Sequence, residues 1–417
     1  MPPSYRRPPR FAVGCALAAL AVTLASPSQA DPAPSFADLL AQLDQAPATL
    51  EADALSDAAQ AQLRQAGVRP NPTVGLTSEN GFGTRDFSGY GNAETTLSIT
   101  QDLELWGRRS ARIDVARAEA GTAGLRRNLA VVDAAGRLAL AYATAEAAQR
   151  RFDLAEEFLA LTLADARAAL VLVQEGREPL LRGIQGESEA AAARASLDEA
   201  QAERDAAFAR LTAIAMLPTP VTEIEASLLD RTPAMAIVPV LAAPTVRVAE
   251  AERTSAERRI AVERIRARPD VSASVGVRRF EAQNATALTI GLSLPLPLFD
   301  RNRGNIEAAQ AQFRAADARL SGALQDAQAD RAAARARLGA SASRVSASEA
   351  GIASAEEAYR LSRIGFEAGR ISQLELRLTR TTLINARNAA VDARLARVRA
   401  EIDLARQDGR APFQGAE

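Results

Sequence analysis

The residues that could do chemistry in this chain are almost all carboxylates and arginines. The 417-residue sequence holds 50 basic and 51 acidic residues, no histidine and a single cysteine, Cys15, and every basic residue is an arginine. Ser-His-Asp or Cys-His catalysis and an ordinary zinc site therefore lack essential groups, and no phosphate-binding glycine loop is present. Paired carboxylates are too common here to be specific. The sequence predicts neither an enzyme nor a cofactor or metal site.

Two glycine turns carry charged residues, and each has a Gly-Arg pair at the matching position. The turns span residues 174–181 and 365–376, and their candidate contact residues are Gly176, Arg177, Glu178, Pro179, Gly369, Arg370, Ser372 and Glu375. Glycine ends one helix and proline opens the next in the first turn, whereas Ser372 and Glu375 form a capping box in the second. Two interpretations stay open, because these residues can be helix caps, docking contacts or both. Charges elsewhere along the helices are interpreted as a solvated face.

Long helices must position these turns. From Arg108 to about Val173 the pattern is helical without a proline, a length of about 100 Å at 1.5 Å per residue, and a second helix returns to about Met216. In the other half a helix of some sixty residues follows Asn305, and the last helix runs to about Arg406. In the long helix after Asn305 apolar residues recur every seven positions, which predicts a coiled-coil partner. These heptad positions include Ile306, Phe313, Leu320, Leu338 and Val345, with Arg331 as the one interruption.

Strands precede each long helix. Up to Leu298 every second residue from Leu288 is apolar, which is the two-residue period of a strand, and the same pattern precedes Arg108. Strands at 73–79 and 270–279 complete two hairpins, and a helix is predicted over 36–66. The strand residues predicted to face lipid are Leu97, Ile99, Leu103, Leu288, Ile290, Leu292 and Leu294.

The two halves repeat each other. Ile113 corresponds to Ile306 and Gly176 to Gly369, both at an offset of 193 residues, so the duplication is architectural. The predicted organisation is a signal peptide at 1–30, a first strand-strand-helix-helix repeat at 31–217, a proline-rich linker at 218–244 and a second repeat at 245–417.

The N-terminus predicts export. A basic start, an apolar run and the small residues around Ala30 form a signal peptide. Lipidation of Cys15 is disfavoured, because most of the apolar run follows it. Cleavage leaves 47 arginines against 51 acids, a charge of about −4, and no thiol. Such a chain lacks the clustered positive charge that indicates nucleic-acid binding.

Four strands cannot close a barrel, and open strand edges cannot sit in lipid because their backbone groups would lack partners. The chain must therefore oligomerise. A homotrimer would supply twelve strands, an even number within the range of outer-membrane barrels, with the polar strand faces around Thr96 and Thr289 lining a wet lumen.

The sequence as a whole resembles a known family. The layout is similar to the TolC-like outer-membrane efflux proteins over nearly the whole mature chain, and RPNPTVGLTSEN, ETTLSITQDLELWGRRSAR and LTIGLSLPLPLFDRNRGNI look like its CzcC-type branch. The resemblance implies a mainly α fold, a trimeric channel-tunnel with a twelve-stranded barrel in the outer membrane and a coiled-coil helical barrel in the periplasm. It also implies a periplasmic adaptor (membrane fusion protein) and an inner-membrane RND pump exporting divalent metal ions.

Within that resemblance the two glycine turns are the periplasmic tip, where the adaptor docks and the tunnel closes. Relatives often carry an acid three residues after the position of Glu375, whereas this chain has Leu378. Two other functions remain open from the sequence. The same channel could serve multidrug efflux or type I secretion, or the chain could be a soluble periplasmic coiled-coil scaffold, although a scaffold leaves the amphipathic strands unexplained.

Overall fold

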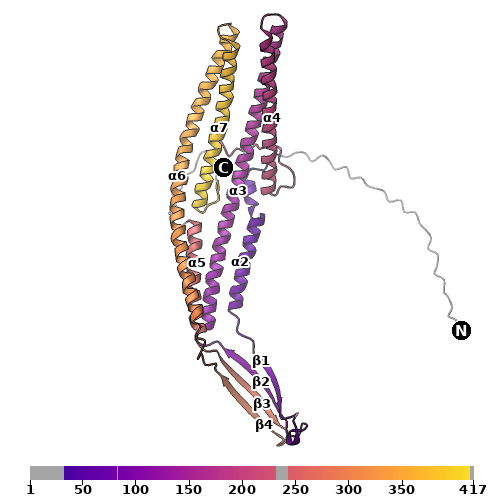
Figure 1. The fold of residues 1–417 in the computed structure, drawn as a ribbon, viewed down its shortest axis with the longest axis vertical. Coiled ribbons are helices and arrows are strands. Elements are labelled where there is room, and N and C mark those ends of the chain that lie inside the picture. Colours follow the sequence, from indigo (N-terminus) through magenta and orange to yellow (C-terminus); the bar gives the residue numbers. More distant parts are fainter. Residues whose placement is uncertain (1–31, 82, 232–242, 414–417) are drawn as a thin grey trace, which may run out of the picture.

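The computed structural model describes residues 32–81, 83–231 and 243–413. The molecule is elongated, with four strands at one end and two helical hairpins at the other (Figure 1). The predicted signal peptide and residues 232–242 of the predicted linker lie outside the described residues. Among the described residues no helix combines the length and the apolar character needed to cross a membrane.

Two long helices form the spine of the molecule, and shorter helices pack on them. The α-helices are α1 (Phe36–Ala41), α2 (Pro47–Ala66), α3 (Arg108–Gln174), α4 (Leu180–Ile214), α5 (Pro244–Arg266), α6 (Arg303–Glu367) and α7 (Gln373–Gln407). Short 3-10 turns lie at Leu43–Gln45 and Arg85–Phe87. The prediction of one helix over 36–66 is wrong. A new helix starts at Pro47, whose missing N–H is tolerated only in a first turn.

The architectural repeat is confirmed at the level of elements. Helices α3 and α6 have 67 and 65 residues, and each follows a residue with left-handed backbone, Gly107 or Asn302. Helices α4 and α7 both have 35 residues, and Gln373 lies 193 positions after Leu180. Each half thus consists of a long helix and an antiparallel return helix.

The sheet is antiparallel in the order β1-β2-β3-β4. Its strands are β1 (Thr73–Glu79), β2 (Glu94–Leu103), β3 (Val271–Phe280) and β4 (Ala285–Ser293). The predicted extension of the last strand to Leu298 is wrong, because β4 ends at Ser293. Pro295 and Pro297 follow, and neither can donate a ladder hydrogen bond. Leu294 therefore lies just beyond the strand on which it was predicted.

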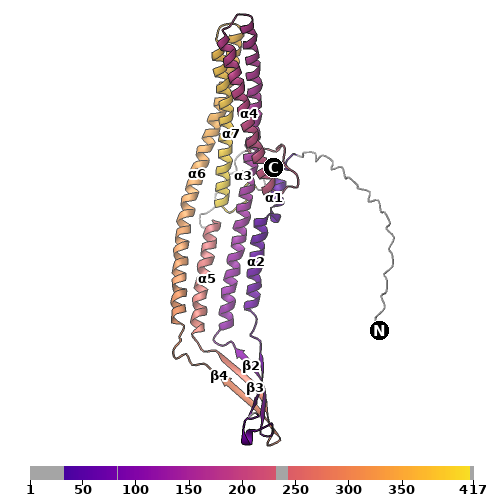
Figure 2. The same cartoon turned by 45° about the vertical axis from the view of Figure 1, so that its right-hand side comes forward.

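Near the sheet, α2, α3, α5 and α6 lie side by side, whereas α3 pairs with α4 and α6 with α7 toward the other end (Figure 2). The main core lies where these two arrangements meet. Tyr142 is fully buried there and donates a hydrogen bond to the carbonyl of Ala226 at 2.9 Å, and its ring packs edge-on against Phe36.

The described part of the predicted linker, residues 218–231, is irregular but packed. Leu228 and Leu229 are buried in the main core. The carboxylate of Glu146 accepts hydrogen bonds from both backbone N–H groups, at 2.8 and 3.1 Å, and from the hydroxyl of Ser227 at 2.6 Å. A buried carboxylate is stable only with such partners, so Glu146 fixes this segment against α3.

Candidate functional site

One face of the sheet is apolar and exposed. Its side chains form two rows across all four strands: Val74, Ile99, Val275 and Ile290, and then Leu76, Leu97, Val277 and Leu288. Ile290 is 81% exposed. So large an apolar patch is unusual on a soluble monomer and marks an interaction surface.

Most of the side chains predicted to face lipid lie on this face. Leu97, Ile99, Leu288, Ile290 and Leu292 are exposed there. Leu103 shares their alternation but is only half-exposed, opposite the buried Val271. Leu294 is exposed just after the end of β4.

The other face of the sheet is polar. Thr96, Ser98, Thr100 and Thr289 lie on it with Arg278, whose guanidinium donates to Thr96 Oγ1 at 2.9 Å and to Glu94 at 3.1 Å. Arg278 was not among the site residues predicted from the sequence. Its position on the polar alternation of the strand was the available signal.

Arg108 and Arg109 of the Gly-Arg-Arg motif, with Arg112 one turn later, connect the start of α3 to the segments that precede β1 and β3. Arg108 forms an ion pair with Asp270 at 2.8 Å. The guanidinium of Arg109 donates to the carbonyl of Gly67 at 2.8 Å, and Arg112 binds Glu104 and the carbonyl of Val68. Planar guanidinium groups suit such multiple contacts. They fix the sheet rigidly to the helical layer.

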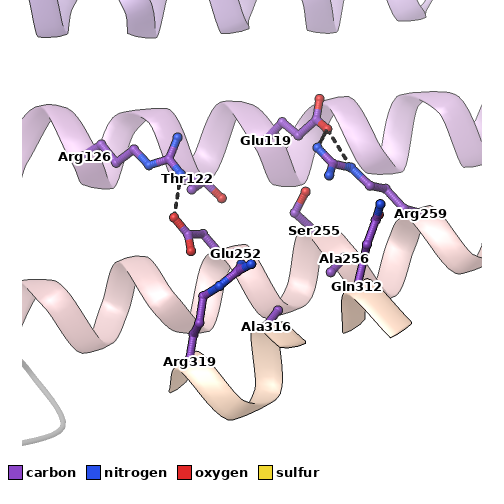
Figure 3. A pocket seen from close by; sticks show the side chains of 10 residues that line it. All are labelled: Glu119, Thr122, Arg126, Glu252, Ser255, Ala256, Arg259, Gln312, Ala316 and Arg319. Carbon is purple, nitrogen blue, oxygen red and sulfur yellow. Dashed lines mark hydrogen bonds and ion pairs between the residues drawn. The ribbon is translucent and has the colours of Figure 1, made fainter. Parts of the chain in front are cut away.

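A polar groove runs along one face of this helical layer. A hollow of about 430 Å³ lies between α3, α5 and α6 (Figure 3). Two ion pairs cross it, Arg126–Glu252 at 2.5 Å and Arg259–Glu119 at 2.6 Å. Arg319 also lines it and makes no ion pair within the described chain.

The groove is continuous with the polar face of the sheet. Adjoining hollows share the side chains of Glu119, Arg112 and Arg266, and the hollow nearest the sheet is lined by Asp102 and Asp270. By the strand alternation Asp102 belongs to the polar face, opposite Ser272. The polar strand face and the groove therefore form one wall. This wall was not predicted from the sequence, although the spacing of residues 252, 256 and 259 on α5 is helical.

The glycine turns at the far end have the same geometry. Gly176 and Gly369 have φ of 70° and 69°. In both turns the next residue donates its backbone N–H to the carbonyl of the residue five positions earlier. Arg177 donates to Leu172 at 2.9 Å, and Arg370 donates to Gly365 at 2.8 Å. This is a Schellman motif. The capping interpretation of both glycines is confirmed, and Ser372 caps α7 by accepting from the N–H of Glu375 at 3.3 Å.

The charged residues of the two turns differ in their pairing. Arg177 pairs with Glu175 at 3.2 Å, and Glu178 with Arg182 at 3.7 Å. Pro179 is the N-cap of α4 and lies one position before the helix in which it was predicted. In the second turn the side chains of Arg370 and Glu375 are exposed and make no ion pair within the described chain.

Large apolar side chains surround these charges. Leu180, Leu181, Leu374 and Leu378 are all exposed beside the turns. An exposed apolar surface with unpaired charges at the end of a helical hairpin is suited to contact another protein.

Arginines of α7 join the two hairpins below the turns. The buried Arg380 forms an ion pair with Asp165 of α3, and its guanidinium lies 5.5 Å from the ring centroid of Phe158. Arg387 bridges Glu157 of α3, at 2.9 Å, and Glu356 of α6, at 3.0 Å. Burial, with the neighbouring cations, lowers the pKa of Arg377, which contacts Glu189 of α4.

No cluster of three or more metal-ligating side chains occurs in the described ranges. The chain instead offers a continuous polar wall along an elongated molecule, an apolar strand face and an end with exposed apolar and charged side chains. Together these features are typical of a membrane channel protein. The chain belongs to the outer membrane efflux protein family, whose family model matches residues 41–215 and 241–410. It is a transport channel of the outer membrane that extends into the periplasm, and it is not an enzyme.

Relatives and solved structures agree with this assignment. The chain is 41% identical to the nickel and cobalt resistance protein CnrC of Cupriavidus metallidurans over 78% of each chain. It is 39% identical to the nickel-cobalt-cadmium resistance protein NccC of Alcaligenes xylosoxydans xylosoxydans, over 77% of this chain and 74% of that protein. The cobalt-zinc-cadmium resistance protein CzcC is 30% identical over 61% of each chain. The predicted resemblance to the CzcC-type branch is confirmed.

The outer membrane channel CmeC of Campylobacter jejuni matches with a TM-score of 0.78 at 14% identity, over 92% of this chain and 86% of that one. The outer membrane protein VceC of Vibrio cholerae matches with a TM-score of 0.72 at 21% identity, over 90% and 96%. At such low identity the likeness shows the fold alone, and the predicted TolC-like fold is confirmed.

Proposed function

We propose that three copies of this chain form the exit duct of a tripartite efflux system for divalent metal cations. The observation that carries the proposal is the four-stranded sheet with an apolar and a polar face and two unpaired edges, β1 and β4. Such edges are unstable in lipid. Pairing β4 of one copy with β1 of the next closes a twelve-stranded ring, which satisfies every edge.

The two faces then have distinct roles. The apolar rows around Leu97 and Ile290 face lipid, whereas the polar wall from Thr96 through Glu119 lines the lumen. Mixed arginines and carboxylates on this wall keep it hydrated. A hydrated cation can pass such a wall without being held, because most carboxylates already have an arginine partner.

The glycine turns are the proposed docking end for a periplasmic adaptor, which connects the duct to an inner-membrane RND pump. Arg370 and Glu375 support this role, because both side chains are exposed and unpaired within the described chain. The metal cargo is supported by the resistance functions in the names of the three relatives. The pump and not the duct would select the ion.

A deletion strain tests the proposal. We expect loss of the chain to raise sensitivity to nickel, cobalt, cadmium or zinc several-fold, while sensitivity to detergents and dyes stays unchanged. The reverse pattern would establish the multidrug alternative. Recovery of the wild-type chain in the soluble periplasmic fraction would instead establish the scaffold alternative.

Complementation locates the docking end. We expect R370Q/E375Q to assemble in the outer membrane but fail to restore metal resistance. The matched control is E307Q/R335Q, which neutralises an exposed glutamate and an exposed arginine of α6 that also have no partner in the described chain. The control should restore resistance fully. Full activity of the tip variant would exclude docking through these charges.

A further inference from the structure

The helices have an outer face opposite the groove. On α5, Arg259 lines the groove, and Arg264 is five residues further, about 140° around the helix. Arg264 is also eleven residues, or three turns, after Arg253, so both point to the same side. Arg253 pairs there with Asp317 of α6 at 2.7 Å. Arg264 therefore points away from the polar wall.

Helix α6 shows the same division. Gln312 lines the groove, and Arg303, nine residues earlier, is half a turn away from it. Arg303 lies eleven residues before Arg314, so these two share the outer side. The start of α6 lies beside the end of β4, at the junction of sheet and helices (Figure 2). Arg303, the first residue of α6, is thus an outward-facing cation at the junction of sheet and helices.

Four arginines at this junction lack a counter-ion. Arg264, Arg301 and Arg303 make no hydrogen bond or ion pair within the described chain, and Arg268 makes no ion pair. Glu263 binds Arg266 at 2.7 Å, and Asp300 accepts only a backbone N–H, from Asn302 at 2.8 Å. Glu307, one helical turn after Arg303, is exposed and makes no ion pair within the described chain. Four arginines against Asp300 and Glu307 leave the junction with an excess of positive charge.

Exposed aromatic and apolar side chains accompany these arginines. The guanidinium of Arg268 lies 5.7 Å from the ring centroid of Trp106, whose indole N–H donates to the carbonyl of Pro269 at 3.2 Å. Trp106 is 49% exposed, and Phe299, in the segment between β4 and α6, is 99% exposed. Leu298 beside it is exposed as well. Tryptophan and arginine at the border of an apolar band are typical of a membrane–water interface.

We propose that this junction belt, comprising Trp106, Arg264, Arg268, Phe299, Arg301 and Arg303, binds the headgroups of anionic phospholipids in the leaflet that faces the periplasm. The inference rests on the proposed lipid-facing role of the apolar strand rows. The belt residues lie close to the helical ends of β2, β3 and β4, which carry those rows, and their excess positive charge complements phosphate. Guanidinium groups bind phosphate oxygens through paired N–H donors.

Anionic headgroups should be preferred, because no cation within the headgroup balances the charge of their phosphate, as choline does in phosphatidylcholine. One arginine near an anionic lipid surface contributes roughly a fivefold gain in affinity, the factor that corresponds to about 1 kcal/mol. The belt fixes the depth of the channel, since its aromatic rings lie at the headgroups and its cations just beyond them.

Trp106 is the only tryptophan in the sequence, so its fluorescence reports on the belt. The full chain is reconstituted in vesicles of phosphatidylcholine with a minor fraction of phosphatidylglycerol, and one lipid at a time carries bromine near the headgroup end of its acyl chains. We expect brominated phosphatidylglycerol to quench Trp106 several-fold more strongly than an equal fraction of brominated phosphatidylcholine. Free inorganic phosphate should not remove this preference.

The variant R264Q/R268Q/R301Q/R303Q should lose the preference while Trp106 remains quenched by lipid. The matched control, R314Q/R319Q/R335Q/R344Q, removes four exposed arginines of α6 that have no partner in the described chain, and it should keep the preference. Equal quenching by both lipids in the wild-type channel would overturn the proposal even if the variants fail to fold, and so would unchanged selectivity in the junction variant.

Conductance across planar bilayers separates this inference from the proposed function. A channel that conducts but whose Trp106 is not quenched by any brominated lipid would exclude the junction belt and leave the exit duct standing. A chain that neither inserts nor conducts would overturn both.

Discussion

The guanidinium of Arg331 lies 3.0 Å from the carboxylate of Asp408, and both side chains are almost fully buried, at 6% and 0% exposure. Arg331 is the residue that interrupts the heptad pattern of α6. Near Arg331 the helix that packs against α6 changes from α5 to α7, because α5 starts at Pro244 and α7 ends at Gln407. Gly409 contacts Pro244 so closely that no Cβ would fit. The ion pair fills the gap between the two helix ends.

Breaking this pair should destabilise the chain strongly. R331M removes one of the two arginines that pair with the buried carboxylate of Asp408 and leaves Arg410 at 3.2 Å, so the expected loss approaches but does not exceed the roughly 3–5 kcal/mol of a fully unpaired buried charge. R331M/D408L removes both charges and should recover much of that stability. R335Q, an exposed arginine nearby, should change stability by no more than about 0.5 kcal/mol. Chemical denaturation followed by circular dichroism measures all three, and equal stability of R331M and R335Q would contradict the role of the pair.

The sequence predicts periodic elements well and their junctions poorly. Residue spacing predicts the long helices, the strands of both hairpins and the glycine turns, because helix propensity and strand alternation are local properties. The partner of Arg331 could not be predicted, since Asp408 is 77 positions away and is brought near only by the return of α7. The polar groove was missed for the same reason, because Arg126 and Glu252 meet across two helices. Pro295 did signal the end of β4 in the sequence itself.

The left-handed glycines of the tip should not tolerate a side chain. G369A places a Cβ at a φ of 69°, which costs roughly 1–2 kcal/mol. We expect amide hydrogen exchange at residues 365–372 to become faster, by up to about tenfold for each 1.4 kcal/mol of stability that the variant loses. G351A lies inside α6 with open space around it and should stabilise the helix by about 0.5–1 kcal/mol. If both variants slow exchange equally, the turn geometry is wrong.

The arginines of α7 should restrain the tip. R380Q removes the ion pair with Asp165, and the loosened contact between α7 and α3 should raise single-channel conductance. A double-mutant cycle with D165N should give a coupling energy of about 0.5–3 kcal/mol. R363Q removes a pair that is 64% and 66% exposed and should leave conductance unchanged. Additive effects of R380Q and D165N would show that this contact is not the restraint.

Tyr142 should ionise at a higher pH than a tyrosine in water. Burial, together with the charge of Glu146, raises the pKa of Tyr142 from 10.0 to about 12. A raised pKa stabilises the folded chain below pH 10, and this stabilisation is lost as pH rises toward 12. Absorbance at 295 nm should show a late phase that Y142F removes and Y90F retains. A titration curve that Y142F leaves unchanged would place the phenol in solvent.

The two faces of β4 can be separated with single arginines. I290R puts a charge on the apolar face, where a lipid-facing arginine costs about 2–4 kcal/mol at the middle of the bilayer, so assembly in the outer membrane should fall. T289R places the same side chain one residue away on the polar face, beside Gly276. This variant should assemble and change ion selectivity, because three added cations would line the lumen. Heat-modifiable mobility on gels measures assembly, and bilayer recordings measure selectivity. Equal assembly defects in both variants would reverse the assignment of lipid and lumen on which the twelve-stranded ring depends.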